Sequence, residues 1–132
     1  MVERVLRFFA VIIAAISDRI ITFVIIMTAD EKLQIEEKVV EMIKTVYDPE
    51  IPIDVYSLGL IYKIDLADDG ALNIDMTLTA PNCPAADFIV DDMRMKVESV
   101  EGVTSVNINI VFEPEWNKDM MTEEAKLELG FL

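Results

Sequence analysis

The spacing of the apolar residues changes repeatedly along this chain, and these changes limit the possible folds more than any other feature. From Thr28 to Val46 they recur every three or four residues, which is typical of an amphipathic helix. From Leu72 to Thr79 and from Val103 to Phe112 they alternate with polar residues, which predicts strands with one buried face. Helical spacing also follows Pro84, and the inner stripe of that helix is expected to hold Phe88, Ile89, Met93, Val97 and Val100.

Turn and cap signals complete the order of the elements. A further strand over Leu60–Leu66 precedes the turn signal Asp68-Asp69-Gly70, so the first two strands should form a hairpin. We expect Gly102 to occupy the C′ position of the second helix, and a last helix to begin after Thr122 as N-cap and end at Gly130. The order α-β-β-α-β-α predicts an α+β fold of two layers, with a small mixed sheet covered by helices on one face.

Composition excludes several functions. The chain has 25 acidic and 11 basic residues and a net charge of −14, which opposes binding to nucleic acid or to anionic lipid. It has one cysteine and no histidine, so histidine-based acid–base catalysis and a closed four-ligand zinc site are excluded within one chain. A lone cysteine also agrees with a reducing compartment, so we predict a cytoplasmic protein.

Residues 1–26 form an apolar leader that we expect to lie outside the fold, with the domain spanning residues 27–132. Ser17-Asp18-Arg19 places two charges in the middle of the apolar run, which is costly for a membrane-spanning helix. Thr28 and Glu31 form a capping-box signature directly after Met27, which favours a domain that begins there. A signal peptide and a membrane anchor remain alternatives, and we expect membrane contact only if the leader is part of the mature protein.

Cys83 carries the most reactive side chain in the sequence. Pro84 suits the first position of the following helix, which would make Cys83 its N-cap and direct the thiol towards backbone amides. We therefore expect an accessible and modestly activated thiol. The alternative, a small buried hydrophobic residue, is equally supported by position alone. One thiolate cannot hold an iron–sulfur cluster by itself, so a second subunit or a partner would have to supply the other ligands.

Two further groups of residues are candidates for function. Asp48, Glu50 and Asp54 offer hard carboxylate ligands for a metal, although solvated loop acids with Asp48 capping a turn are the more favoured interpretation. The second group is an apolar patch that would contact a partner protein, formed by Trp116, Phe112 and Phe131-Leu132. The alternative for Trp116 is a position in the core.

Three motifs resemble the SufT/PaaD-like metal–sulfur cluster assembly family, which includes the eukaryotic cytosolic iron–sulfur assembly component. They are Asp48-Pro49-Glu50-Ile51-Pro52 with its continuation to Tyr62, Leu78-Thr79-Ala80-Pro81-Asn82-Cys83-Pro84, and a C-terminal block from Trp116 to Gly130. The resemblance implies that Cys83 is the working thiol and a possible iron or cluster ligand. It further implies supporting roles for Asp48, Glu50, Thr79 and Pro84. The apolar leader has no counterpart in the family's core.

By this resemblance the chain would be an accessory factor in iron–sulfur cluster assembly, not an enzyme with turnover chemistry of its own, and would act as carrier or adaptor through the Cys83 loop. Its cargo would be a transient cluster or iron, and its partners would be assembly proteins, client apoproteins and, in a homodimer, a second copy. Two alternatives remain open. One is an interaction module in which Cys83 is structural, and the other is a maturation subunit dedicated to a single multicomponent oxygenase.

Overall fold

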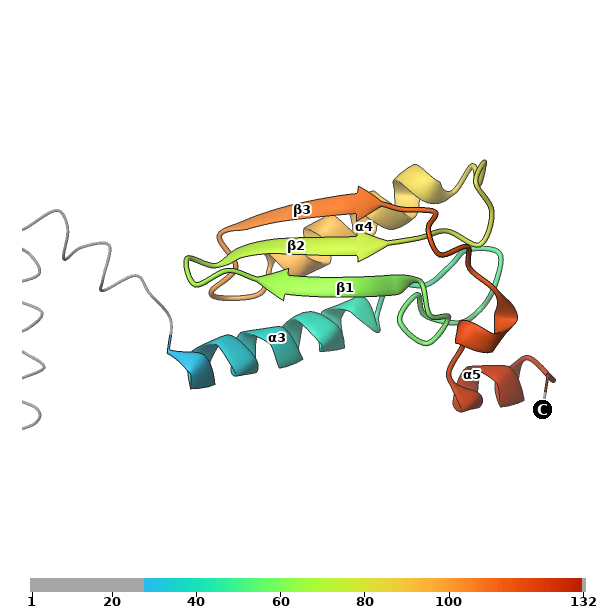
Figure 1. Ribbon diagram of the computed structural model, residues 1–132, viewed down its shortest axis with the longest axis horizontal. Helices are drawn as coiled ribbons and strands as arrows, with labels where there is room; N and C mark the ends of the chain where they lie inside the picture. Colours follow the sequence, from blue (N-terminus) through green and yellow to red (C-terminus); the bar gives the residue numbers. More distant parts are fainter. Residues whose placement is uncertain (1–27, 132) are drawn as a thin grey trace, which may run out of the picture.

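The computed structural model describes residues 28–131 and confirms the expected α+β architecture (Figure 1). Its elements are α3 (Ala29–Ile43), β1 (Ile61–Leu66), β2 (Ala71–Met76), α4 (Ala86–Glu98), β3 (Ser105–Ile110), the 3₁₀ helix η1 (Lys118–Met120) and α5 (Glu123–Glu128). The leader, Met27 and Leu132 lie outside the described residues. None of the helices in the described part has the length and apolar character needed to cross a membrane.

The three strands form one mixed sheet in the order β1-β2-β3. β1 and β2 are antiparallel and joined by the predicted turn, in which the Ala67 amide donates to the Ala71 carbonyl over 2.8 Å. β3 lies parallel to β2, because the chain crosses over through α4 before it returns to the sheet. β2 and β3 are shorter than predicted, since the chain leaves the sheet after Met76 and Ile110.

Both long helices cover the same face of the sheet. α3 packs against β1, α4 packs against β3, and the two helices contact each other. Leu72, Ile74 and Met76 of β2 point into this layer and are buried, whereas Asn73 is exposed on the other face. The alternation of apolar and polar residues in β2 therefore corresponds, as predicted, to one buried and one solvent-exposed face.

The helix ends confirm two predicted caps. The Thr28 hydroxyl accepts from the Glu31 amide over 3.2 Å and the Glu31 carboxylate accepts from the Thr28 amide over 3.0 Å, so the capping box forms. The Thr122 hydroxyl accepts from the Ala125 amide over 3.2 Å at the start of α5. These side chains satisfy amides that have no partner inside a helix.

Two predictions about α4 were wrong. Phe88 is 65% exposed, because the buried stripe runs through Ile89, Met93 and Val97 and the preceding residue points about 100° away. Gly102 is not the C′ residue, since α4 ends at Glu98 and its C-cap is Ser99. Gly102 instead lies against Ile35 of α3, where an added Cβ would come within 2.5 Å of the Ile35 Cδ1 atom.

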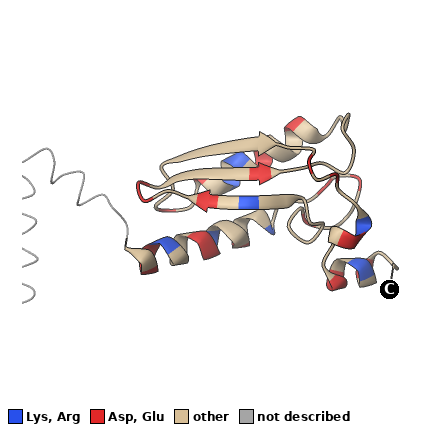
Figure 2. Cartoon of the chain, in the orientation of Figure 1, with Lys and Arg blue, Asp and Glu red and all other residues tan. Residues whose placement is uncertain are grey.

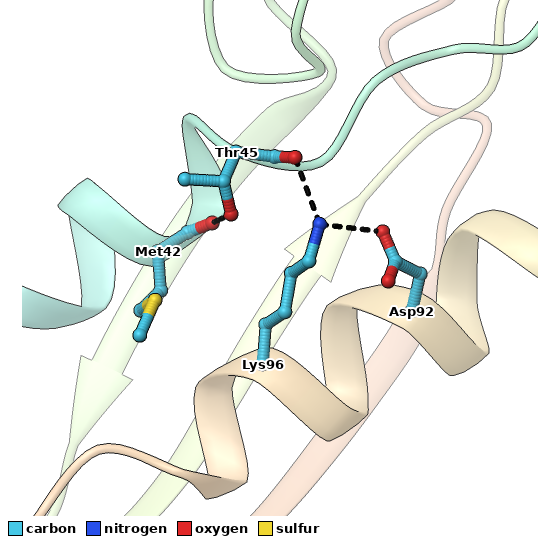
Figure 3. Close-up of polar contacts among 4 residues, drawn as sticks. All are labelled: Met42, Thr45, Asp92 and Lys96. Carbon is cyan, nitrogen blue, oxygen red and sulfur yellow. Dashed lines mark hydrogen bonds and ion pairs between the residues drawn. The ribbon is translucent and has the colours of Figure 1, made fainter.

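A lysine of α4 links the two helices at the end of α3. The Lys96 Nζ donates to the Thr45 carbonyl over 2.8 Å and to the Asp92 carboxylate over 3.0 Å (Figure 3). The last turn of α3 contains no basic residue, so Lys96 supplies the positive charge that a helix C-terminus favours. This contact lies where the chain leaves α3 for the loop that carries Asp48.

Candidate functional site

Three irregular segments meet at one end of the sheet, which we call the loop end. They are residues 46–60 before β1, residues 77–85 after β2 and residues 111–122 after β3. The strand register places Ile61, Met76 and Ile110 side by side, so the three segments leave the sheet together (Figure 1). The Thr77 amide donates to the Leu60 carbonyl and the Val111 amide to the Met76 carbonyl, each over 2.8 Å.

The first segment is held by its own carboxylates. Asp48 is only 4% exposed, and its Oδ1 accepts from the Glu50 amide over 2.8 Å and from the Ile51 amide over 3.3 Å. The Asp54 Oδ1 accepts from the Ser57 amide over 2.8 Å. Asp48 therefore caps a turn, as predicted, but the expectation of solvated loop acids was wrong for Asp48, which is buried, and for Asp54, which is partly buried. Glu50 is exposed and contributes only its backbone amide to this network.

Cys83 lies in a turn before α4 and is partly exposed. Its carbonyl accepts from the Ala86 amide over 3.1 Å, and the N-cap of α4 is Ala85, which makes no side-chain cap bond. The prediction of Cys83 as N-cap with Pro84 at the first helical position was thus wrong. The chain tightens into a turn at Cys83, and the helix begins only after Ala85.

A cleft opens between the second and third segments. Its walls include Thr79 and Pro81 from the cysteine motif and Phe112 and Trp116 from the C-terminal segment, and its volume is about 260 Å³. The Trp116 Nε1 donates to the Leu58 carbonyl over 2.7 Å, which ties this wall to the first segment. The sequence placed Phe112 and Trp116 in one predicted contact patch, but it contains no signal that Thr79 would lie beside them.

Phe131 of that patch lies elsewhere, and Leu132 lies outside the described residues. Phe131 is 48% exposed and stacks under the Lys118 ammonium, 4.5 Å from the ring centroid, rather than lining the cleft. Trp116 is half-buried against the core, so it is both a core residue and a wall of the cleft.

The loop end does not assemble a metal site from its own side chains. Within residues 28–131 no group of three or more Cys, His, Asp or Glu side chains lies close enough together to hold a metal ion. No hydrogen bond connects Cys83 with Asp48 or Glu50 in that range either. Asp48, Glu50, Thr79, Cys83 and Pro84 therefore share one end of the fold without forming a single ligand cluster.

Comparison with known proteins gives these segments a context. The model of the family described as iron–sulfur cluster assembly protein matches residues 36–110, which is more than half of the chain. The chain belongs to this iron–sulfur cluster assembly family. The matched range includes the loop with Asp48, the cysteine motif and all three strands.

Relatives within the family are similar over nearly their whole length. An Fe-S protein maturation auxiliary factor of Porphyromonas gingivalis is 68% identical over 103 residues, which cover 78% of this chain and 98% of that protein. The Fe-S protein maturation auxiliary factor SufT of Staphylococcus aureus is 41% identical over 85 residues, 64% of this chain and 97% of that protein. The predicted SufT-like membership is thereby confirmed.

A solved structure confirms the family fold. The domain of unknown function DUF59 from Bacillus anthracis superposes with a TM-score of 0.71 at 33% sequence identity, covering 75% of this chain and 94% of that one. The two-layer arrangement described above is therefore shared with a solved relative.

Proposed function

We propose that this protein is an accessory factor in the maturation of iron–sulfur proteins and acts as a carrier or adaptor through the Cys83 loop. Family membership supports the general role, since its relatives are named maturation auxiliary factors. The observation that carries the specific role is a partly exposed thiol in a turn at the loop end, next to segments that the fold holds in place.

The chemistry of the chain indicates shared binding of the cargo. A cluster is usually held by four thiolates, and the single cysteine supplies one of them. A cluster or iron ion carried by Cys83 is therefore bound jointly with a second subunit, an assembly protein or a client apoprotein. Asp48 and Glu50 act indirectly in this proposal, because the Asp48 carboxylate shapes the loop through the Glu50 amide. The protein itself catalyses no turnover and works in the cytoplasm.

Complementation tests this role. In cells deleted for the gene, we would measure an endogenous iron–sulfur enzyme and a cluster-free enzyme after expression of wild type, Cys83→Ser or Asn82→Ser. Asn82 is exposed in the same loop, so it controls for loop changes that leave the thiol in place. We expect wild type and Asn82→Ser, but not Cys83→Ser, to restore the activity of the iron–sulfur enzyme. The activity of the cluster-free enzyme should be the same in every strain. Undiminished activity of that enzyme in the deletion strain would reject the assembly role.

A second candidate is an interaction module in which Cys83 is structural. The cleft between Thr79 and Phe112 favours it, because aromatic residues around a hollow are common anchors of protein interfaces. Equal rescue by wild type and Cys83→Ser would support this candidate. A defect confined to one multicomponent oxygenase in the deletion strain would instead indicate a dedicated maturation subunit.

A further inference from the structure

The loop end carries an unusually one-sided charge. Residues 46–60 contain three acidic residues, residues 111–122 contain three with Lys118 as the one base, and residues 77–85 carry no charged side chain. Red acidic positions mark the first and third of these segments in Figure 2. The loop end therefore has a net charge of −5, out of −14 for the chain.

Within the described residues, the bases at or near this end form no salt bridge with its carboxylates. Arg94 donates to the Val106 carbonyl over 2.8 Å, on the side of β3. The ammonium of Lys44 lies 5.1 Å from the centroid of the Tyr56 ring, and Lys118 stacks on a phenylalanine. Within the described part of the chain, Glu113 and Glu115 form no salt bridge.

The cleft at this end combines these charges with an apolar interior. Glu113 and Glu115 line it together with Pro81, Phe112 and Trp116. The indole nitrogen of Trp116 is already bonded to a backbone carbonyl, so the ring contributes only its apolar body to the wall. Phe112 is 45% exposed, so a large apolar side chain is accessible to a partner.

The size of the cleft indicates what kind of group it can bind. Its volume of about 260 Å³ lies below the roughly 300–1,000 Å³ of small-molecule sites, and it suits one or two side chains of a protein. Its two carboxylates repel nucleic acids and anionic lipids and attract Lys and Arg. The occupant thus needs an apolar side chain flanked by positive charge.

We propose that the cleft between residues 77–81 and 111–116 binds a basic segment of a partner protein, with an apolar side chain against Phe112 and Lys or Arg against Glu113 and Glu115. The inference rests on the proposed adaptor role and assigns the partner's chemistry. The bound segment holds its protein beside the turn that carries Cys83, because Pro81 of the cleft wall belongs to the same short segment between β2 and α4.

A peptide-binding assay tests the cleft directly. The probes are fluorescein-labelled hexapeptides in which a central pair of leucines, phenylalanines or serines is flanked on each side by two lysines. Fluorescence anisotropy against the full chain should show saturable binding of the leucine or phenylalanine peptide, weakening as salt rises from about 20 to about 300 mM. The serine peptide should bind at least about fivefold more weakly, since it lacks the anchor.

Matched variants locate the binding. Glu113→Lys and Glu115→Lys should each weaken the apolar peptides about three- to tenfold. The control Glu37→Lys makes the same charge change on α3, away from the cleft, and should leave the affinity within about twofold. Phe112→Ser should weaken binding about fivefold or more, whereas Phe131→Ser, at a similarly exposed phenylalanine outside the cleft, should not. Circular dichroism confirms that each variant is folded.

Three results would overturn the inference. They are no saturable binding of either apolar peptide up to about 1 mM, equal losses for the cleft and control variants, or equal affinity for the serine and leucine peptides. This assay measures binding without any cluster, whereas the complementation experiment measures cluster enzymes. If the peptides do not bind the cleft, the proposed role of Cys83 is therefore unaffected. If Cys83→Ser restores the cluster enzyme, the peptide-binding data can still be interpreted.

Discussion

Gly59 should be the least replaceable residue of the loop end, and Gly59→Ala tests how the C-terminal segment is held. Gly59 has a φ of +77°, and a Cβ there would lie 2.3 Å from the Met120 carbonyl oxygen and 2.8 Å from its carbonyl carbon. Both atoms belong to the backbone, so the clash cannot be relieved by a side-chain rotation. The segment with η1 would have to move away from the turn before β1.

The cost has two parts. A non-glycine residue in the left-handed region costs about 1–2 kcal/mol, and forcing atoms into a packed contact costs about 1–3 kcal/mol more. Gly130→Ala separates them, because Gly130 has a φ of +80° but no atom within 4 Å of the added Cβ. We expect a loss of about 2–5 kcal/mol for Gly59→Ala and about 1–2 kcal/mol for Gly130→Ala. Both alanines restrict the unfolded chain equally, so that contribution cancels in the comparison.

Urea unfolding followed by tryptophan fluorescence provides the measurement. Trp116 is the only tryptophan, and its indole is bonded to the Leu58 carbonyl beside Gly59, so its emission reports on this contact. We expect Gly59→Ala to lower the midpoint clearly more than Gly130→Ala with similar slopes. Equal midpoints for the two variants would show that Met120 does not press on Gly59, and the account of the loop end would be wrong.

Three further predictions concern the same end of the molecule. Asp48→Ala leaves two loop amides without their acceptor and should lower the free energy of unfolding by about 1–3 kcal/mol in urea, whereas Asp48→Asn, which keeps an acceptor oxygen, should lose much less. Lys96→Met removes the contacts with Thr45 and Asp92. Because the charges are partly exposed, we expect the free energy of unfolding to fall by only about 0.5–1 kcal/mol, measured as a lower Tm. An unchanged Tm would contradict a role of Lys96 in joining the helices. Cys83 is partly exposed, so iodoacetamide should alkylate it in the native protein, and a mass spectrum that shows labelling only in urea would contradict an accessible thiol.

The candidate site was only partly predictable. The cysteine motif and the acidic loop are each a continuous stretch of sequence, so Cys83, Asp48 and Glu50 could be named from their motifs. The turn-capping role of Asp48 followed from local chemistry, because its partners lie two and three residues away. The cleft could not be predicted, since Thr79 and Phe112 are far apart in sequence and come together only when β3 lies beside β2.

Two of the errors, the N-cap at Cys83 and the buried Phe88, lie at the start of α4. A proline after a cysteine is an acceptable local signal for a helix start, but the chain makes one more turn there and the cap moves to Ala85. Phe88 is in the same region, at the first turn of α4. It is exposed because the neighbouring Ile89 occupies the buried position of that turn. Which of two adjacent apolar residues is buried depends on how the helix is rotated against the sheet, and periodicity alone does not fix that rotation.

Element type and order were determined by the sequence, because periods of 3.6 and 2 residues and the caps at Thr28 and Thr122 act over a few neighbouring positions. Net charge and the absence of histidine also limited the chemistry, because both follow from composition alone. The tertiary structure alone decided that three distant segments share one end of the sheet, that Gly59 lies against Met120, and that Glu113 and Glu115 line a cleft there. Those contacts depend on strand pairing and helix packing across the whole domain, and such long-range contacts leave no periodic trace in the residues that make them.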